Sequence, residues 1–145
     1  MNDTDSCIFV CNKLLRGELS AIETYSQALE KFDREPENAT LEQIRLEHEE
    51  NAELLREHLS QMGAVPDTDS GAWGSFAKAV EGTAKLLGES AALAALIEGE
   101  QHGIREYEEA LDDPGVMEEA KTSIRETLLP CLSDHVTTLE LLRAR

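Results

Sequence analysis

Apolar residues recur at alternating spacings of three and four along four long segments of the chain. This pattern is typical of amphipathic helices that bury one face. The predicted helices cover approximately residues 4–33, 40–62, 90–112 and 114–145. No segment carries the strict alternation of apolar and polar residues that a half-buried strand needs. The pattern therefore predicts an all-α fold.

The predicted helix ends follow from a few residues with strong local preferences. Thr40 is a plausible N-cap of the second helix, because Gln43 three residues later completes a capping box. Gly63 is a natural stop for the same helix. Pro114 can occupy the first turn of the last helix, whereas Pro130 lies inside that helix and is expected to kink it.

An internal repeat relates the first half of the chain to the second. Residues 17–29 and 99–111 share Gly, Glu, Ile, Tyr, Ala and Leu at a constant offset of 82. A weaker echo relates residues 48–56 to residues 135–143 at an offset of 87. The repeat predicts two similar helical hairpins within a single domain that spans residues 1–145.

The segment between the two predicted hairpins, residues 63–89, is long enough to run back along the bundle. Trp73 and Phe76 start an apolar pattern that predicts a short amphipathic helix ending near Gly88. With such a crossover, the second and third helices point the same way. The predicted fold is therefore a four-helix bundle, made of two helical hairpins and a long crossover that contains a short helix.

The composition indicates a globular chain with a strongly acidic surface. Of the 145 residues, 41% are hydrophobic and 30% are charged, and the formal net charge is −17. Such a charge disfavours nucleic acid and anionic membranes as partners. Three cysteines leave one thiol unpaired in any disulfide scheme, and neither a signal peptide nor a membrane-spanning segment is visible. These observations predict a cytoplasmic protein.

Polar residues interrupt the apolar faces of all four predicted helices at seam positions. Glu18 and Glu100 occupy equivalent places in the first and third helices, His48 and Asn51 lie on the seam of the second, and His135 on that of the fourth. A buried ionised carboxylate is costly unless it is paired or bound to a metal. Carboxylates and imidazoles that face inward from four helices are the ligands of dinuclear iron or manganese sites in bundles.

The repeated Gly-Glu pair, followed by a tyrosine seven residues after the glutamate, resembles the first and third helices of rubrerythrin-type ferritin-like proteins. The whole chain is similar to a bacterial ferritin-like four-helix-bundle family that is catalogued as a domain of unknown function. The residues that carry this second resemblance are Gly63, Pro66, Ser70, Gly71, the Glu98-Gly99-Glu100 motif and His135. The resemblance implies metal binding and a role in iron or oxidative-stress handling.

The di-metal motif of ferritin-like proteins, Glu-x-x-His on the second and fourth helices, is degenerate in this chain. Arg45 stands three residues before His48, and Leu132 stands three residues before His135. Residue by residue, the resemblance therefore carries over the metal-binding role to Glu18 and Glu100, with His48 and His135 as candidate ligands.

The heights of these residues along the bundle argue against a compact site. With the helix ends given above, both glutamates lie near mid-height, whereas both histidines lie roughly two turns, about 11 Å, toward the first hairpin loop. Glu47 and Glu50 lie beside the seam and are expected to point partly outward, while Cys131 is expected to act as a small hydrophobic residue.

Three functions are compatible with these observations. The first is a ferritin-like protein that binds iron, manganese or zinc between Glu18 and Glu100. The second is a metal-free structural or protein-interaction module whose buried polar residues set helix register. A metal-independent enzyme ranks last, because the chain has no nucleophile with a positioned base, no phosphate loop and no dinucleotide-binding motif. We also predict a homodimer, because Trp73 and Phe76 could form an exposed apolar patch.

Overall fold

Helices make up most of the described chain, which in this computed structural model comprises residues 3–30, 32, 36–69 and 88–145. In chain order the elements are α1 (Asp3–Leu29), α2 (Glu37–Gln61), α4 (Glu89–Asp112), α5 (Glu118–Ser123), η2 (Ile124–Leu128) and α6 (Leu129–Arg143). No strand occurs among these residues. The predicted all-α four-helix bundle is confirmed.

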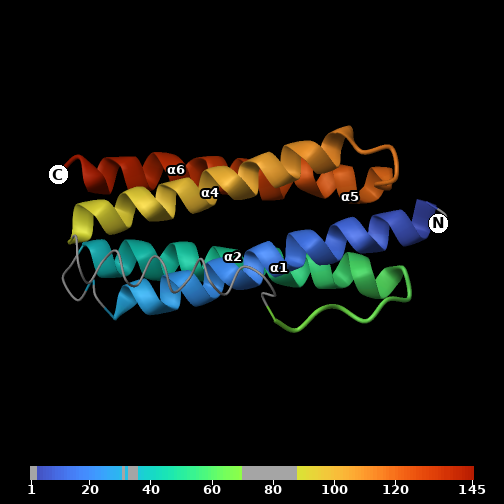
Figure 1. The fold of residues 1–145 in the computed structure, drawn as a ribbon, viewed down its shortest axis with the longest axis horizontal. Coiled ribbons are helices and arrows are strands. Elements are labelled where there is room, and N and C mark those ends of the chain that lie inside the picture. Colours follow the sequence, from blue (N-terminus) through green and yellow to red (C-terminus); the bar gives the residue numbers. More distant parts are fainter. Residues whose placement is uncertain (1–2, 31, 33–35, 70–87) are drawn as a thin grey trace.

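The bundle consists of two antiparallel hairpins that lie side by side (Figure 1). Helices α1 and α2 form the first hairpin, and α4 forms the second with the continuous run of α5, η2 and α6. Helices α2 and α4 point in the same direction, as the predicted crossover requires. The predicted crossover helix, with Trp73 and Phe76, lies outside the described residues. The homodimer therefore stays a prediction.

The two helix ends that flank the loop of the first hairpin differ from the prediction by about one turn. Helix α1 ends at Leu29 instead of residue 33, and α2 begins at Glu37 instead of Thr40. The predicted N-cap at Thr40 is wrong, because its backbone N–H already donates to the carbonyl of Pro36 within the first helical turn. The predicted stop at Gly63 agrees with the structure, since this glycine adopts a φ of 77° that other residues rarely adopt.

A π-helical segment, η2, interrupts the last helix just before Pro130. Proline has no N–H to donate to the preceding turn and clashes with it, so a regular α-helix is disturbed there. The structure accommodates Pro130 in a widened turn, in which the N–H of Leu129 bonds to the carbonyl of Ile124, five residues earlier. This turn sets the rotation of α6 and hence the direction of the side chains that follow it.

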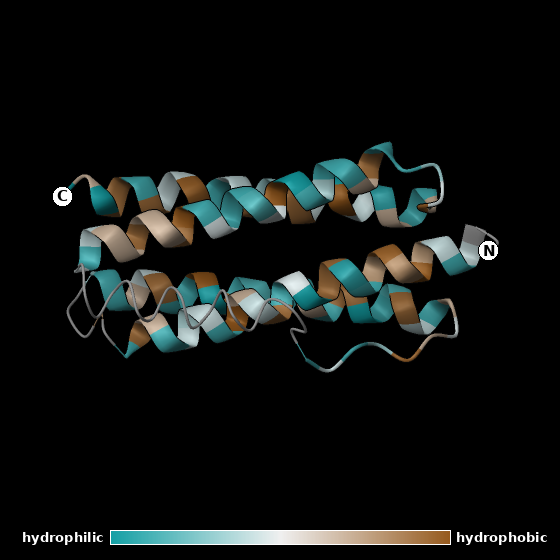
Figure 2. Cartoon of the chain, viewed as in Figure 1, coloured by the Kyte–Doolittle hydropathy of each residue, from teal (hydrophilic) through white to brown (hydrophobic). Residues whose placement is uncertain are grey.

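The apolar core is divided into two clusters by a layer of polar side chains. One cluster includes Leu15, Leu55 and Leu132, and the other includes Leu41, Leu96 and their neighbours. Figure 2 shows hydrophobic and hydrophilic bands that alternate along each helix, as expected for amphipathic elements. None of the described helices is long and apolar enough to cross a membrane.

Candidate metal centre

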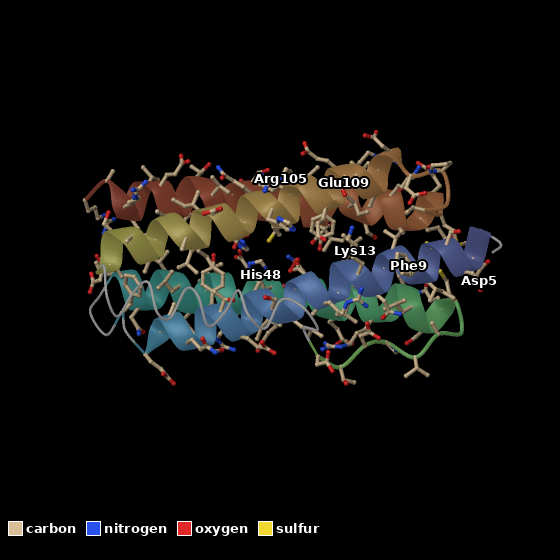
Figure 3. The ribbon with its side chains drawn as sticks, in the orientation of Figure 1. Asp5, Phe9, Lys13, His48, Arg105 and Glu109 are labelled. Atoms are coloured by element: carbon tan, nitrogen blue, oxygen red, sulfur yellow. The ribbon has the colours of Figure 1, made fainter. Side chains whose placement is uncertain are left out.

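The polar layer contains all four residues that the sequence singles out as metal ligands. Glu18 comes from α1, His48 from α2, Glu100 from α4 and His135 from α6. Their exposed fractions are 3%, 2%, 4% and 2%, so the cluster is sealed from solvent. Figure 3 shows His48 in the interior, between the two hairpins.

His48 lies at the centre of the cluster and contacts both glutamates. Its Nδ1 atom lies 2.7 Å from Oε1 of Glu18, and its Nε2 atom lies 2.8 Å from Oε2 of Glu100. His135 approaches the other oxygen of Glu100, with 3.2 Å between Nδ1 and Oε1. The structure therefore brings all four predicted residues together.

The predicted separation of about 11 Å between histidines and glutamates is wrong. Glu18 lies 11 residues before the end of α1 at Leu29, and His48 lies 11 residues after the start of α2 at Glu37. The two residues are therefore at equal distances from the hairpin loop, at about 1.5 Å per residue. The error came from helix ends that were misplaced by four residues in α1 and three in α2.

Two buried tyrosines complete the layer with reciprocal hydrogen bonds. The hydroxyl of Tyr25 donates to Oε2 of Glu100 at 2.6 Å, and the hydroxyl of Tyr107 donates to Oε2 of Glu18 at 2.9 Å. Each tyrosine thus contacts the glutamate of the other hairpin. The ring of Tyr25 also stacks on His48 with 5.5 Å between the ring centroids. These bonds fix the orientation of both carboxylates.

The electrostatics of the layer favour an ionised Glu100 and protonated histidines. Burial alone lowers the pKa of His48, but Glu100 and Glu18 outweigh it and raise the pKa to about 10. Burial likewise opposes protonation of His135, whose pKa is nevertheless raised by its contacts with Cys131 and Glu100. Burial alone raises the pKa of Glu100, yet His48 and His135 bring it down to about 2. In the metal-free cluster, the positive charge is therefore carried by the protonated imidazoles of His48 and His135.

These shifts predict how the stability of the metal-free protein depends on pH. The folded-state pKa of His48 exceeds its ordinary value of 6.5, so its contribution is complete below about pH 6.5 and disappears as the pH rises through about 10. The contribution of Glu100 is complete above about pH 4.5 and disappears as the pH falls toward 2. We expect the melting temperature, measured with a chelator present, to be highest between about pH 4.5 and pH 6.5, where both contributions are complete. A melting temperature that rises from pH 7 to pH 10 would contradict this prediction.

A small cavity adjoins the carboxylates on the side of α1 and α4. It has a volume of about 40 Å³, which is enough for at least one water molecule. Both glutamates and both tyrosines line it, together with His48 and small residues such as Gly17 and Gly99. The cavity offers space for a water or small ligand beside the cluster.

The structure also adds two residues that the sequence analysis set aside. Glu47 accepts a hydrogen bond from Nε2 of His135 at 2.7 Å, although the sequence indicated a partly outward direction. Cys131 was expected to act as a small hydrophobic residue, but its Sγ lies 3.5 Å from the same nitrogen. Two signals were available in the sequence. Glu47 directly precedes His48, and Cys131 stands one helical turn before His135.

The donor set of the layer suits a divalent cation. Donor atoms from His48, Glu100 and His135 all lie within 4.8 Å of one another. Ligands bound at about 2.0–2.2 Å from a metal are separated by no more than about 4.4 Å, so small adjustments would close the site. Imidazole and carboxylate together suit iron, manganese and zinc. The residues present therefore fit a metal ion.

The fold and site define a class of protein: an all-helical bundle with a carboxylate–histidine layer buried at its centre. The chain belongs to the family described as "Domain of unknown function (DUF2383)", whose model matches residues 7–113. The match confirms the predicted membership of a family of unknown function. It includes Glu18, His48 and Glu100 and ends before His135. No curated protein and no solved structure matches the chain.

Proposed function

We propose that this protein is a ferritin-like, metal-binding four-helix bundle that holds iron, manganese or zinc in its buried layer. The observation that carries the proposal is the position of His48, whose two ring nitrogens contact the carboxylates of two different helices. The site already holds positive charge there, in the form of protons. As the resemblance implies, we place its role in iron or oxidative-stress handling.

The contacts support different roles for the two glutamates. Glu100 approaches both histidines and is assigned as a direct ligand together with His48 and His135. Glu18 faces Nδ1 of His48, the nitrogen on the far side of the ring from Glu100. A histidine ligand commonly donates its second N–H to a carboxylate, which orients the ring and raises its basicity. We assign this orienting role to Glu18.

Further contacts of Glu18 support the orienting role. Tyr107 donates to one of its oxygens, and the amide of Asn51 donates to the other at 3.2 Å. These bonds engage both oxygens of Glu18 with groups that are not metal ligands. The contacts of Glu100, by contrast, are the two histidines and the hydroxyl of Tyr25. The cavity beside the layer is lined by His48 and Glu100 and provides space for a water or small molecule next to these two residues. A bound divalent ion would act there as a Lewis acid and, as iron or manganese, as an electron carrier.

Metal binding would leave the charge of the layer unchanged. In the metal-free state, the raised pKa values of His48 and His135 keep both imidazoles protonated, so each carries one positive charge. One divalent cation supplies the same two positive charges once both histidines are neutral. No additional buried charge would have to be stabilised, which supports exchange of protons for metal.

Metal ions are expected to raise the melting temperature of protein purified without a metal-affinity step. A ligand present at 100 times its dissociation constant stabilises the folded state by about 2.7 kcal/mol. Changing both Glu18 and Glu100 to glutamine should abolish this gain and leave the helix content intact. Among the single variants, Glu100→Gln should abolish it, whereas Glu18→Gln should weaken metal affinity by about 10–100-fold.

Thermal unfolding followed by circular dichroism, with manganese, iron or zinc titrated into the sample, measures these effects. Glu50→Gln is a matched control, because this glutamate is exposed on the same helix as His48. Titrations in which the wild type and the double variant behave identically would reject metal binding in the layer.

The second candidate function is a metal-free structural or protein-interaction module. The favouring observation is that every buried side-chain nitrogen and oxygen among the described residues has a hydrogen-bond partner without an ion. Such a satisfied network can fix helix register on its own. Elemental analysis of the purified protein separates the two candidates: a stoichiometric metal supports the first, and its absence after growth with added metals supports the second.

A further inference from the structure

A second group of ligand-type side chains lies on the other side of His135, away from the buried layer. Cys131 and His135 are four residues apart on α6, so both project toward α2 from successive turns. On α2, Oε1 of Glu47 lies 2.7 Å from Nε2 of His135 and 3.9 Å from Sγ of Cys131. The sulfur lies 3.5 Å from the same nitrogen. A sulfur, a nitrogen and an oxygen thus converge on one point.

This point is accessible from solvent, unlike the inner layer. A surface groove of about 420 Å³ between α2 and α6 is lined by Glu47 and His135 together with Thr40, Gln43 and Asp134. The Glu47 side chain is 37% exposed and forms the boundary between the groove and the buried imidazole. A hydrated cation in the groove would therefore meet Glu47 first.

The two ring nitrogens of His135 face different groups. One nitrogen can therefore bind a cation on the side of Cys131 and Glu47 while the other stays bonded to Glu100. When Nε2 binds a cation, Nδ1 keeps its proton and donates to Glu100, which lies 3.2 Å away. The amide of Asn51 donates to Sγ of Cys131 at 3.6 Å and holds the sulfur in place. Both outer ligands on α6 are thus oriented by buried groups behind them.

We propose that Cys131, His135 and Glu47 form an outer site for a divalent cation of the zinc type. A thiolate, an imidazole and a carboxylate are the ligands that zinc takes, and three protein ligands leave a fourth position for water. On binding, the cation replaces the thiol proton of Cys131 and the Nε2 proton of His135, and both protons are released to solvent. A neutral imidazole has one lone pair, so His135 binds one cation at a time. An ion that accepts sulfur, such as zinc, can therefore occupy either site but not both, whereas manganese prefers the inner one.

Cobalt(II) is a suitable probe, because it takes zinc sites and gives a thiolate-to-metal charge-transfer band in the near ultraviolet. We expect reduced, chelator-treated protein to develop this band and to saturate it at one cobalt per chain. Cys131→Ser should abolish the band, and Glu47→Gln should weaken cobalt binding by at least about tenfold. Cys11→Ala is the matched control, because Cys11 is buried in the apolar core and should leave the band intact.

The measurement separates this site from the proposed inner one. Manganese should produce no charge-transfer band, and its effect on the melting temperature should be equal in the wild type and in Cys131→Ser. A band that is absent from the wild type, or that survives Cys131→Ser, overturns the outer site. A cobalt band without any stabilisation by manganese supports the outer site and rejects the proposed function of the inner layer. Circular dichroism of each variant verifies that it has folded.

Discussion

Replacing His48 with leucine is expected to lower the free energy of unfolding of the metal-free protein by about 3–5 kcal/mol. His48 separates the carboxylates of Glu18 and Glu100 and contacts both. Without its positive charge, two buried carboxylates face each other, and leucine offers neither of them a hydrogen bond. The loss is a large fraction of the 5–15 kcal/mol that a typical domain has in total. Denaturant unfolding followed by circular dichroism measures it.

Two variants show whether the loss comes from charge. His58→Leu makes the same substitution at a partly buried histidine, whose Nε2 atom forms a hydrogen bond with the hydroxyl of Ser123 at 2.8 Å. It should cost about 1 kcal/mol. Adding Glu18→Gln and Glu100→Gln to His48→Leu replaces both carboxylates with neutral amides and should restore most of the lost stability. If the triple variant is as unstable as His48→Leu alone, packing and not charge explains the effect.

The apparent affinity of the inner layer for a divalent cation is expected to rise about 100-fold per pH unit between pH 6 and pH 8. The pKa of His48 is raised to about 10 by Glu100 and Glu18, and that of His135 is also raised, so both histidines are protonated in this range. A metal binds only neutral imidazole, so each cation displaces two protons. Each displaced proton contributes about tenfold per pH unit while the pH stays below the pKa.

Calorimetric titration with manganese in buffers of different ionisation enthalpy counts the released protons directly. We expect two protons per cation in the wild type and one in His135→Gln, whose slope with pH should fall to about tenfold per unit. Equal affinity at pH 6 and pH 8 would contradict the prediction, because it would mean that the histidines are neutral before the metal arrives. If the protein is instead a metal-free structural module, we expect no manganese binding at either pH.

The residues of the buried layer show most clearly what could be predicted from the sequence. Glu18, His48, Asn51, Glu100 and His135 all occupy seam positions, and all five are buried in the structure. Burial of a helical residue depends on the spacing of its apolar neighbours, which is a local property of the sequence. The all-α class followed from the same spacing, and the common direction of α2 and α4 followed from the length of the segment that connects them.

The sequence failed where the result depended on small shifts between separate helices. The predicted ends of the first two helices were four and three residues off, and these errors added up to the predicted gap between His48 and Glu18. Helix ends are the least reliable part of a sequence-based prediction, because several residues in succession can act as caps. An error of one turn, about 5.4 Å, decides whether two side chains touch.

The outer group of Glu47, Cys131 and His135 depended still more on tertiary structure. Glu47 lies at the edge of the seam, where a modest rotation of α2 decides between solvent and the imidazole of His135. The direction of Cys131 depends on the π-helical turn before Pro130, which rotates everything that follows it in α6. The sequence by itself determined that these five polar residues are buried and on which helix each one lies. Only the tertiary structure decided which of their atoms meet, because hydrogen bonds require ångström-scale positions that are set jointly by helix ends, loop lengths and helix rotation.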